Sequence, residues 1–232
     1  MIKRYFTSLF SEAGNHNNKN IIDLLQVNNR ATFCDLGCDD GSWTEELIKK
    51  IGTRDIYGIE IVDSRRKLAE ERGIKAKTGD LNEEFPFEDD FFDVIHSNQT
   101  IEHLYDTTNF IKEIKRTLKP GGYAIVSTEN ASSWHNIFAL MLGWQMFSLT
   151  NIDSERSGVG NPLSIHRLEL NPLKTWEHQR IFAYRGLKEV FEVQGFKVEK
   201  IVCSGYYPFP WWFAKFDPRH GHFIAIKVRK LQ

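Results

Sequence analysis

The sequence predicts an α/β fold in which a mostly parallel sheet carries helices on both faces. Apolar runs typical of buried strands alternate four times with segments of helical period between residues 31 and 128. The first run leads into a turn framed by glycines and then into a helix-compatible segment, residues 42–50. A chain of 232 residues is long enough for one sizeable α/β core and too short for two catalytic domains.

The first strand and its turn, residues 33–41 with the sequence FCDLGCDDG, predict a ligand site. The first amides of a helix have no partner inside the helix, and glycines let a backbone approach a ligand closely. A dinucleotide-binding loop would carry glycine where this chain has Asp39 and Ser42. The carboxylates of Asp35, Asp39 and Asp40 favour a cationic ligand such as S-adenosylmethionine. The alternative is an ordinary strand-to-helix turn.

The second and third strands, predicted over residues 55–62 and 75–81, add two carboxylates. Glu60 follows Gly41 by 19 residues, the spacing at which a carboxylate can bind both ribose hydroxyls. Asp80 could accept a hydrogen bond from the exocyclic amine of adenine, while Leu81 covers the ring. The alternatives are a surface charge at a strand end for Glu60 and a loop cap for Asp80.

The remaining elements follow at longer intervals. Residues 91–100 predict a fourth strand, 109–118 a helix that stops at the KPGG turn, and 123–128 a fifth strand. A helix over 184–194 ends at Gly195 and leads into a strand over 196–203. Residues 223–228 predict the last strand.

Four motifs occur in order between residues 32 and 128: DLGCDDG, YGIE, GDL, and DVIHSNQTIEHL followed by LKPGG. In order and spacing they resemble the class I S-adenosylmethionine-dependent methyltransferases, especially the broad group of quinone-biosynthesis and small-molecule enzymes. The resemblance implies a Rossmann-like seven-stranded sheet, whose last strand runs antiparallel beside the fifth. It also implies methyltransferase activity with S-adenosylmethionine as cofactor.

The resemblance further implies a set of cofactor-binding positions along the strand ends. The family loop usually has glycine at the position of Asp39, so this side chain is expected to tune cofactor affinity. The implied cofactor-binding residues are Asp35, Gly37, Cys38, Asp39, Gly41, Glu60, Ile61, Asp80, Leu81, Ser97, Asn98 and Gln99.

We expect one domain over residues 1–232 with four parts: a helical leader (1–30), a cofactor-binding half (31–129), an insertion (130–180) and the closing helix and strands (181–232). The leader predicts an amphipathic turn or two over residues 19–27 and a second short helix around Tyr5, Phe6, Leu9 and Phe10. It would either cover the cofactor cleft, as in the resembled family, or pack on the sheet.

The insertion is longer than the basic fold needs and too apolar for disorder. Residues 137–149 are 13 in number, short of a membrane span, and favour a lid helix over the acceptor pocket, with membrane-surface contact as the less favoured alternative. A second aromatic block, residues 206–216, could build an apolar acceptor cavity with Trp134, Trp144 and Trp176, or could form a surface crossing stiffened by prolines.

Composition excludes several function classes. The 30 basic and 31 acidic residues give a net charge of -1, without the basic patch that nucleic-acid binding needs. Three cysteines without a CxxC pattern predict neither a disulfide framework nor a zinc site. No apolar segment of signal-peptide length follows the basic N-terminus, which favours a cytoplasmic protein.

Catalysis of methyl transfer mostly requires alignment of the acceptor, and a base helps where a hydroxyl is methylated. His103, just after the fourth strand, is the first candidate base, and the resembled family places a Glu-His pair here, which adds Glu102. The alternative for His103 is a cap at a helix start. His135 and His166 in the insertion are lesser candidates. The resemblance also raises a divalent cation on Glu102 and His103, as in some quinone methyltransferases, but adjacent residues point apart and no further ligand is evident, so no metal is expected.

The leading hypothesis is therefore an S-adenosylmethionine-dependent methyltransferase for a small or lipid-like acceptor such as a quinone, a lipid or a sugar precursor. A catalytically silent cofactor-binding or interaction module of the same fold is the main alternative. A nicotinamide-dependent reductase is disfavoured by Asp39 and Ser42.

Overall fold

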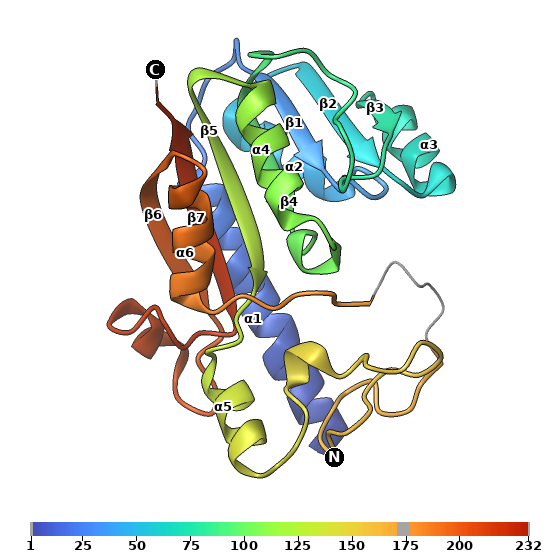
Figure 1. The fold of residues 1–232 in the computed structure, drawn as a ribbon, viewed down its shortest axis with the longest axis vertical. Helices are drawn as coiled ribbons and strands as arrows, with labels where there is room; N and C mark the ends of the chain where they lie inside the picture. Colours follow the sequence, from blue (N-terminus) through green and yellow to red (C-terminus); the bar gives the residue numbers. More distant parts are fainter. Residues whose placement is uncertain (1, 171–176, 232) are drawn as a thin grey trace.

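The computed structural model describes residues 2–170 and 177–231. Its centre is a seven-stranded sheet in the order β3-β2-β1-β4-β5-β7-β6, with helices on both faces (Figure 1). All strand pairs are parallel except those of β7, which runs antiparallel between β5 and β6. The strands are β1 (Thr32–Leu36), β2 (Asp55–Glu60), β3 (Lys75–Thr78), β4 (Phe92–Asn98), β5 (Leu118–Glu129), β6 (Phe196–Ser204) and β7 (Phe223–Lys230).

This topology confirms the predicted fold class, including the antiparallel last strand beside β5. The chain order reverses between β1 and β4, and in open α/β sheets ligands bind outside the carboxyl ends of the strands at this point. The central strand β4 is buried along most of its length, as expected for a parallel strand covered on both faces. Most of the predicted binding residues follow β1, β2, β3 and β4, so they collect at one sheet edge.

Two apolar cores lie on opposite faces of the sheet. One includes Phe110 and Ile114 of α4 together with Leu187 and Phe191 of α6. The other includes side chains of α1, α2 and α3. Full burial of each large apolar side chain contributes roughly 1.5–3 kcal/mol. The helices are α1 (Ile2–Leu24), α2 (Ser42–Ile51), α3 (Asp63–Glu71), α4 (Thr107–Thr117), α5 (Trp134–Met141) and α6 (Tyr184–Val193), with short 3-10 turns η1 (Ile101–His103), η2 (Phe147–Leu149) and η4 (Trp211–Lys215).

The leader is one continuous helix, so the expectation of two short helices was wrong. Helix α1 runs for 23 residues and packs against β5, β6 and β7. Its last turns bury Ile21 and Leu24 in the sheet core, whereas its first turns extend beyond the sheet to the insertion, as Figure 1 shows. The intervening polar residues do not break the helix because none is proline and Gly14 costs only about 1 kcal/mol relative to alanine.

The insertion contains less helix than its apolar character suggested. Helix α5 ends at Met141, and Gly143 adopts a left-handed φ of 72° that reverses the chain before η2. The expectation of one lid helix over residues 137–149 was therefore wrong. Asn136 ties the two pieces together, because its buried amide donates to the Ser148 hydroxyl at 2.8 Å. Among the described residues, no helix is both long and apolar enough to cross a membrane.

The aromatic block after β6 forms a surface crossing. Trp211, Trp212 and Phe216 on and after η4 are exposed, and only Tyr206 and Tyr207 turn inward. The stiffened crossing, the second of the two sequence interpretations, therefore describes most of this segment. Trp176, the third tryptophan predicted to line an acceptor cavity, lies outside the described residues.

Candidate functional site

The loop between β1 and α2 has the tight geometry that its glycines suggested. Gly37 has a φ of 77°, and a Cβ added there would lie 2.7 Å from the Thr100 hydroxyl. Gly41 has a φ of 79°, and its Cβ would lie 2.5 Å from Ile74. Both positions need a residue without a side chain, since left-handed backbone and close packing coincide there. The loop backbone is therefore fixed and open toward the sheet edge.

Asp39 replaces the usual family glycine in the same left-handed conformation, with a φ of 47°. Aspartate tolerates this region better than most residues. Its carboxylate lies 3.3 Å from the Arg65 guanidinium and is largely exposed. The extra negative charge is thus partly balanced by Arg65 beside the cleft. Cys38, the preceding residue, packs its sulfur against Gly58 and is buried, which raises the pKa of its thiol.

Asp35 is buried and already hydrogen-bonded on both oxygens. The register of β1 and β4 places it opposite His96, whose Nδ1 lies 2.7 Å from one Asp35 oxygen. The Thr44 hydroxyl donates to the other oxygen at 2.6 Å. Asp35 therefore reaches a ligand mainly through His96, whose buried Nε2 has no hydrogen-bond partner. Sequence reasoning missed His96, although its place on β4 opposite the β1 aspartate could have indicated it.

Glu60 lies at the carboxyl end of β2 and closes the cofactor loop from the side. One carboxylate oxygen accepts from the Asp39 amide at 3.0 Å and the other from the Val62 amide at 2.8 Å. Each oxygen keeps a second lone pair for a ligand hydroxyl. Its neighbour Ile61 is about half exposed and lines the same cleft. Glu60 therefore both orders the loop and faces the ligand space.

Asp80 and Leu81 follow β3 at the far end of the cleft. The Asp80 carboxylate accepts from the Asn82 amide at 2.9 Å and from the Asn82 side chain at 2.8 Å. This is the loop cap that the sequence offered as the alternative, and Asp80 lines the cleft at the same time. Leu81 is buried with part of its surface toward the cleft.

The end of β4 places its three predicted residues differently. Ser97 is fully buried, and its hydroxyl donates to the Leu36 carbonyl behind the loop. Asn98 lines the cleft and accepts from Asn17 of α1 at 3.2 Å. Gln99 lines it too, with a left-handed φ of 53° and a buried side-chain nitrogen without a partner. Asn98 and Gln99 thus face the ligand space, while Ser97 supports the strand.

These residues surround a two-part cleft at the sheet edge. A cavity of about 490 Å³ extends from the loop past β2 and β3. A smaller one of about 260 Å³ lies between the loop, α1 and His96. The two share Gly37, Asp39 and Asn98, so together they form one elongated groove. Of the twelve predicted cofactor residues, Gly41 and Ser97 alone do not line it; those that do are Asp35, Gly37, Cys38, Asp39, Glu60, Ile61, Asp80, Leu81, Asn98 and Gln99.

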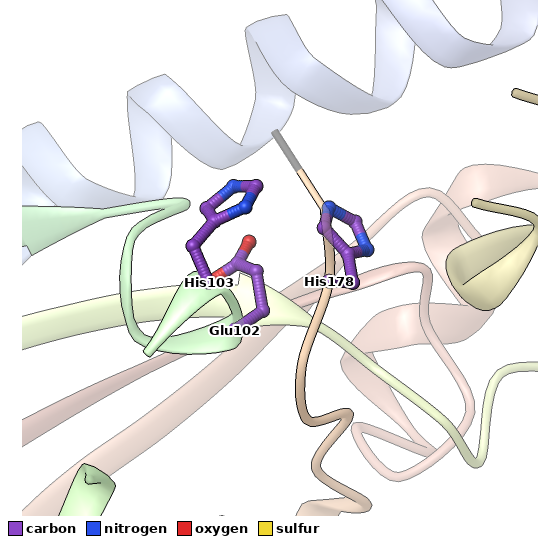
Figure 2. Close-up of side chains that lie close together, drawn as sticks. All are labelled: Glu102, His103 and His178. Carbon is purple, nitrogen blue, oxygen red and sulfur yellow. The ribbon is translucent and has the colours of Figure 1, made fainter. Parts of the chain in front are cut away.

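His103 lines this groove, the preceding Glu102 is fully buried, and the return segment of the insertion adds His178 beside them. The three side chains lie close together, and one donor atom from each falls within 4.8 Å of the others (Figure 2). The expectation that the pair points apart and lacks a further ligand was wrong, because residues far away in sequence supply His178. Burial raises the pKa of Glu102 to about 7. Burial and the neighbouring His178 lower the pKa of His103 to about 4, which makes it a weaker base than a free imidazole.

A second cavity, of about 470 Å³, lies on the other side of His178 between α1 and the insertion. Apolar lining comes from Phe6, Phe10 and Phe147, and both lesser catalytic candidates, His135 and His166, also line it. Trp134 and Trp144 do not line it, so neither of these two tryptophans contributes to this cavity. His103 lines the groove, His178 lines this cavity, and their rings lie 4.8 Å apart. The two spaces therefore adjoin at this pair.

The floor of the second cavity carries a buried polar network. His222 lies 3.6 Å from Glu129 and is hydrogen-bonded through Nδ1 to the Tyr207 hydroxyl. Burial raises the pKa of Glu129. Hydrogen bonding to His222 and the charge of His222 outweigh burial and hold the pKa of Glu129 below its usual range. Burial lowers the pKa of His135 and raises that of Tyr207. The cavity therefore combines apolar walls with two neutral hydrogen-bonding groups, His135 and Tyr207, and the ionised carboxylate of Glu129.

Comparison with known proteins places this geometry among methyltransferases. A family model described as "Methyltransferase domain" matches residues 8–201. A demethylmenaquinone methyltransferase of Staphylococcus carnosus is 28% identical over 113 residues, which are 46% of each protein. Staphylococcus aureus enzymes of the same name are 30% identical over the same share. The matched region thus spans less than half the length of these curated relatives.

Solved structures share the fold at low sequence identity. A methyltransferase of Haloferax volcanii, determined with the Trm112 methyltransferase activator, has a TM-score of 0.64 and 14% identity, over 100% of this chain and 98% of that one. A geranyl diphosphate C-methyltransferase of Streptomyces coelicolor, determined with Mg²⁺, geranyl diphosphate and S-adenosyl-L-homocysteine, has a TM-score of 0.60 and 14% identity, over 94% of this chain and 81% of that one.

Proposed function

The chain belongs to the methyltransferase-domain family of class I S-adenosylmethionine-dependent enzymes, and on that premise we propose that it methylates a small or lipid-like acceptor held in the second cavity. The observation that carries the proposal is the contact of the two spaces at His103 and His178. A donor in the groove and an acceptor in the cavity would meet there.

The groove fits the family's cofactor on its own geometry. A Cβ at Gly37 would clash with the Thr100 side chain, so only glycine leaves this part of the loop backbone bare where it lines the groove. Buried nitrogens of His96 and Gln99 have no protein partner, and a buried polar group without a partner is costly. A polar ligand in the groove would satisfy both. The residues present therefore fit S-adenosylmethionine.

We assign each part of the cofactor to residues by position along the groove. Glu60 would hold the ribose hydroxyls with its free lone pairs. Asp80 and Leu81 would hold the adenine, and the loop at Gly37 with the Asp35–His96 pair would hold the methionyl end. When bound, S-adenosylmethionine supplies a methyl group on a positively charged sulfur and therefore the electrophile.

The chain itself aligns the acceptor and excludes water. The first turns of α1 and the insertion enclose the second cavity, and Lys3 and Glu169 join them through an ion pair of 2.6 Å. Methyl transfer is an in-line displacement, so holding both reactants in line accounts for much of the acceleration. A dry site assists a reaction in which the donor's positive charge disappears.

The cavity lining selects an acceptor with an apolar body and a polar end. Phe6, Phe10 and Phe147 suit a ring or chain, whereas Tyr207 and His135 suit a hydroxyl or carbonyl group. Quinones, lipids and sugar precursors with apolar substituents meet this description. A quinone is the first acceptor to test, because the curated relatives are named for demethylmenaquinone.

Two measurements test the proposal. Isothermal titration should show one S-adenosylhomocysteine bound per chain, and absence of binding at millimolar ligand would exclude it. Release of S-adenosylhomocysteine from S-adenosylmethionine should then depend on an acceptor from a quinone, lipid and sugar-precursor panel. A Phe147→Arg variant, which fills the cavity with charge, should lose turnover but keep cofactor binding. Cofactor binding without turnover on any acceptor, joined to a stable protein complex, would favour the silent module instead.

A further inference from the structure

Glu102, His103 and His178 are held together by backbone contacts between two separate segments. The amides of Gln179 and Arg180 both donate to the Glu102 carbonyl, at 2.7 and 3.1 Å. The return segment therefore runs alongside η1 and fixes His178 beside the Glu-His pair, as Figure 2 shows. The backbone therefore places the three residues next to one another.

Both histidines have their ring orientation and tautomer set by backbone carbonyls. His103 Nδ1 lies 3.1 Å from the Glu177 carbonyl, and His178 Nδ1 lies 2.6 Å from the Ser148 carbonyl. A carbonyl only accepts, so each Nδ1 carries the proton and donates it. In the neutral rings, each Nε2 is then left with a lone pair. A histidine that ligates a metal through one nitrogen typically donates from the other in this way.

Glu102 supplies a buried carboxylate oxygen that the protein leaves without a partner. The side chain is fully buried, and one oxygen accepts from the Thr128 hydroxyl at 2.9 Å. The other oxygen, Oε1, has no hydrogen-bond partner. Such an atom is rare in a folded protein and calls for an unseen proton, water or ion. One carboxylate oxygen of Glu102 lies within 4.8 Å of a ring nitrogen of each histidine, and this grouping of three possible metal ligands favours an ion.

We propose that Glu102, His103 and His178 bind a divalent transition-metal ion of the Zn²⁺ class between the cofactor groove and the acceptor cavity. Two imidazoles and one carboxylate are a donor set that suits Zn²⁺ and not Mg²⁺, which prefers oxygen ligands. Ligands of a tetrahedral ion at about 2.1 Å lie about 3.4 Å apart, so donors within 4.8 Å of one another would approach by at most about 1.4 Å on binding.

Three protein ligands leave one coordination position open, as in catalytic zinc sites. The ion would offer that position to an oxygen of the acceptor, which would explain why the cluster lies where the two spaces adjoin. This role rests on the proposed function, whereas the metal site itself does not. His103 would then act as a ligand and not as the base.

The test is metal binding to the chelator-treated full chain. Competition with a chromogenic zinc chelator should show one Zn²⁺ bound per chain, and Co²⁺ should give the absorption bands of a four-coordinate site with nitrogen and oxygen ligands. Mg²⁺ at the same concentration should not compete. Failure to bind Zn²⁺, or equal competition by Mg²⁺, would overturn the proposal.

Two variants and two controls locate the ion. His178→Gln and Glu102→Gln should each weaken Zn²⁺ binding by about 100-fold or more. Loss of an outer-shell partner alone weakens metal binding by about 10- to 100-fold, and these variants remove direct ligands. His166→Gln, on the same insertion, and His135→Gln, in the same cavity, should bind Zn²⁺ like the wild type. Loss of Zn²⁺ binding in His135→Gln but not in His178→Gln would contradict the proposal.

Cofactor titration separates this proposal from the proposed function. The His178→Gln variant should still bind S-adenosylhomocysteine like the wild type, because His178 does not line the groove, and that result also shows that the variant is folded. Wild-type Zn²⁺ binding without cofactor binding would support the metal site and contradict the methyltransferase assignment.

Discussion

Replacing Glu60 by glutamine should weaken cofactor binding and protein stability together. The carboxylate accepts two backbone amides, at 3.0 and 2.8 Å, and an amide side chain keeps only one acceptor oxygen. One amide of the loop therefore loses its acceptor. A hydrogen bond to a charged group is worth about 1.5–3 kcal/mol, so the free energy of unfolding should fall by about that amount. The ribose should lose one acceptor too, which corresponds to an increase in Kd of about 10- to 150-fold.

Calorimetric titration of S-adenosylhomocysteine and urea unfolding measure the two effects separately. Glu88→Gln, an exposed carboxylate on the loop before β4, is the matched control and should change neither quantity. An analogue that lacks the ribose 2′- and 3′-hydroxyls should bind the wild type and Glu60→Gln almost equally. An unchanged Kd for S-adenosylhomocysteine in Glu60→Gln would refute the ribose assignment. So would a loss of affinity for the dideoxy analogue as large as the loss for S-adenosylhomocysteine itself.

Three further predictions test other parts of the structure. Gly37→Ala should abolish S-adenosylhomocysteine binding. Gly73→Ala, where the glycine has a similar φ but nothing lies within 4 Å of an added Cβ, should lower the free energy of unfolding in urea by only about 1 kcal/mol. Equal effects of the two variants on stability and on cofactor binding would contradict the close-packing argument. Asn136→Ala should lower the free energy of unfolding by about 1–3 kcal/mol, because it leaves buried partners unsatisfied, and a value near zero would show that η2 does not depend on this side chain. Burial raises the pKa of Cys203 to about 12, so a thiol reagent at neutral pH should modify it slowly in the folded protein and rapidly in urea; rapid modification of the folded protein would show that β6 opens readily.

The cofactor half of the molecule was predictable because its residues follow consecutive strands. Parallel strands end at one edge of the sheet, so Asp35, Glu60 and Asp80 had to lie near one another once the strand pattern was recognised. The pattern could not predict that both carboxylate oxygens of Asp35 are already hydrogen-bonded, one to His96 and the other to Thr44. That contact depends on the register of β1 against β4, which single-strand patterns do not fix.

The second half of the site was less predictable because long-range contacts form it. The segment that carries His178 is joined to Glu102 by backbone hydrogen bonds from Gln179 and Arg180, across more than seventy residues, and no local pattern specifies them. The apolar run in the insertion suggested a helix, yet Gly143 ends α5 before the run is complete. The sequence did not predict that α1 is continuous, because the middle of the helix is mostly polar and shows no clear apolar periodicity. Packing against the sheet stabilises this helix.

The central claim is that a donor in the sheet-edge groove faces an acceptor in the cavity beyond His178. A crystal structure of the protein with S-adenosylhomocysteine tests it most directly. The account predicts that Glu60 contacts the ribose and that the sulfur lies at the junction of the two spaces, facing His103 and His178. A ligand bound elsewhere, or a sulfur turned away from that junction, would contradict it.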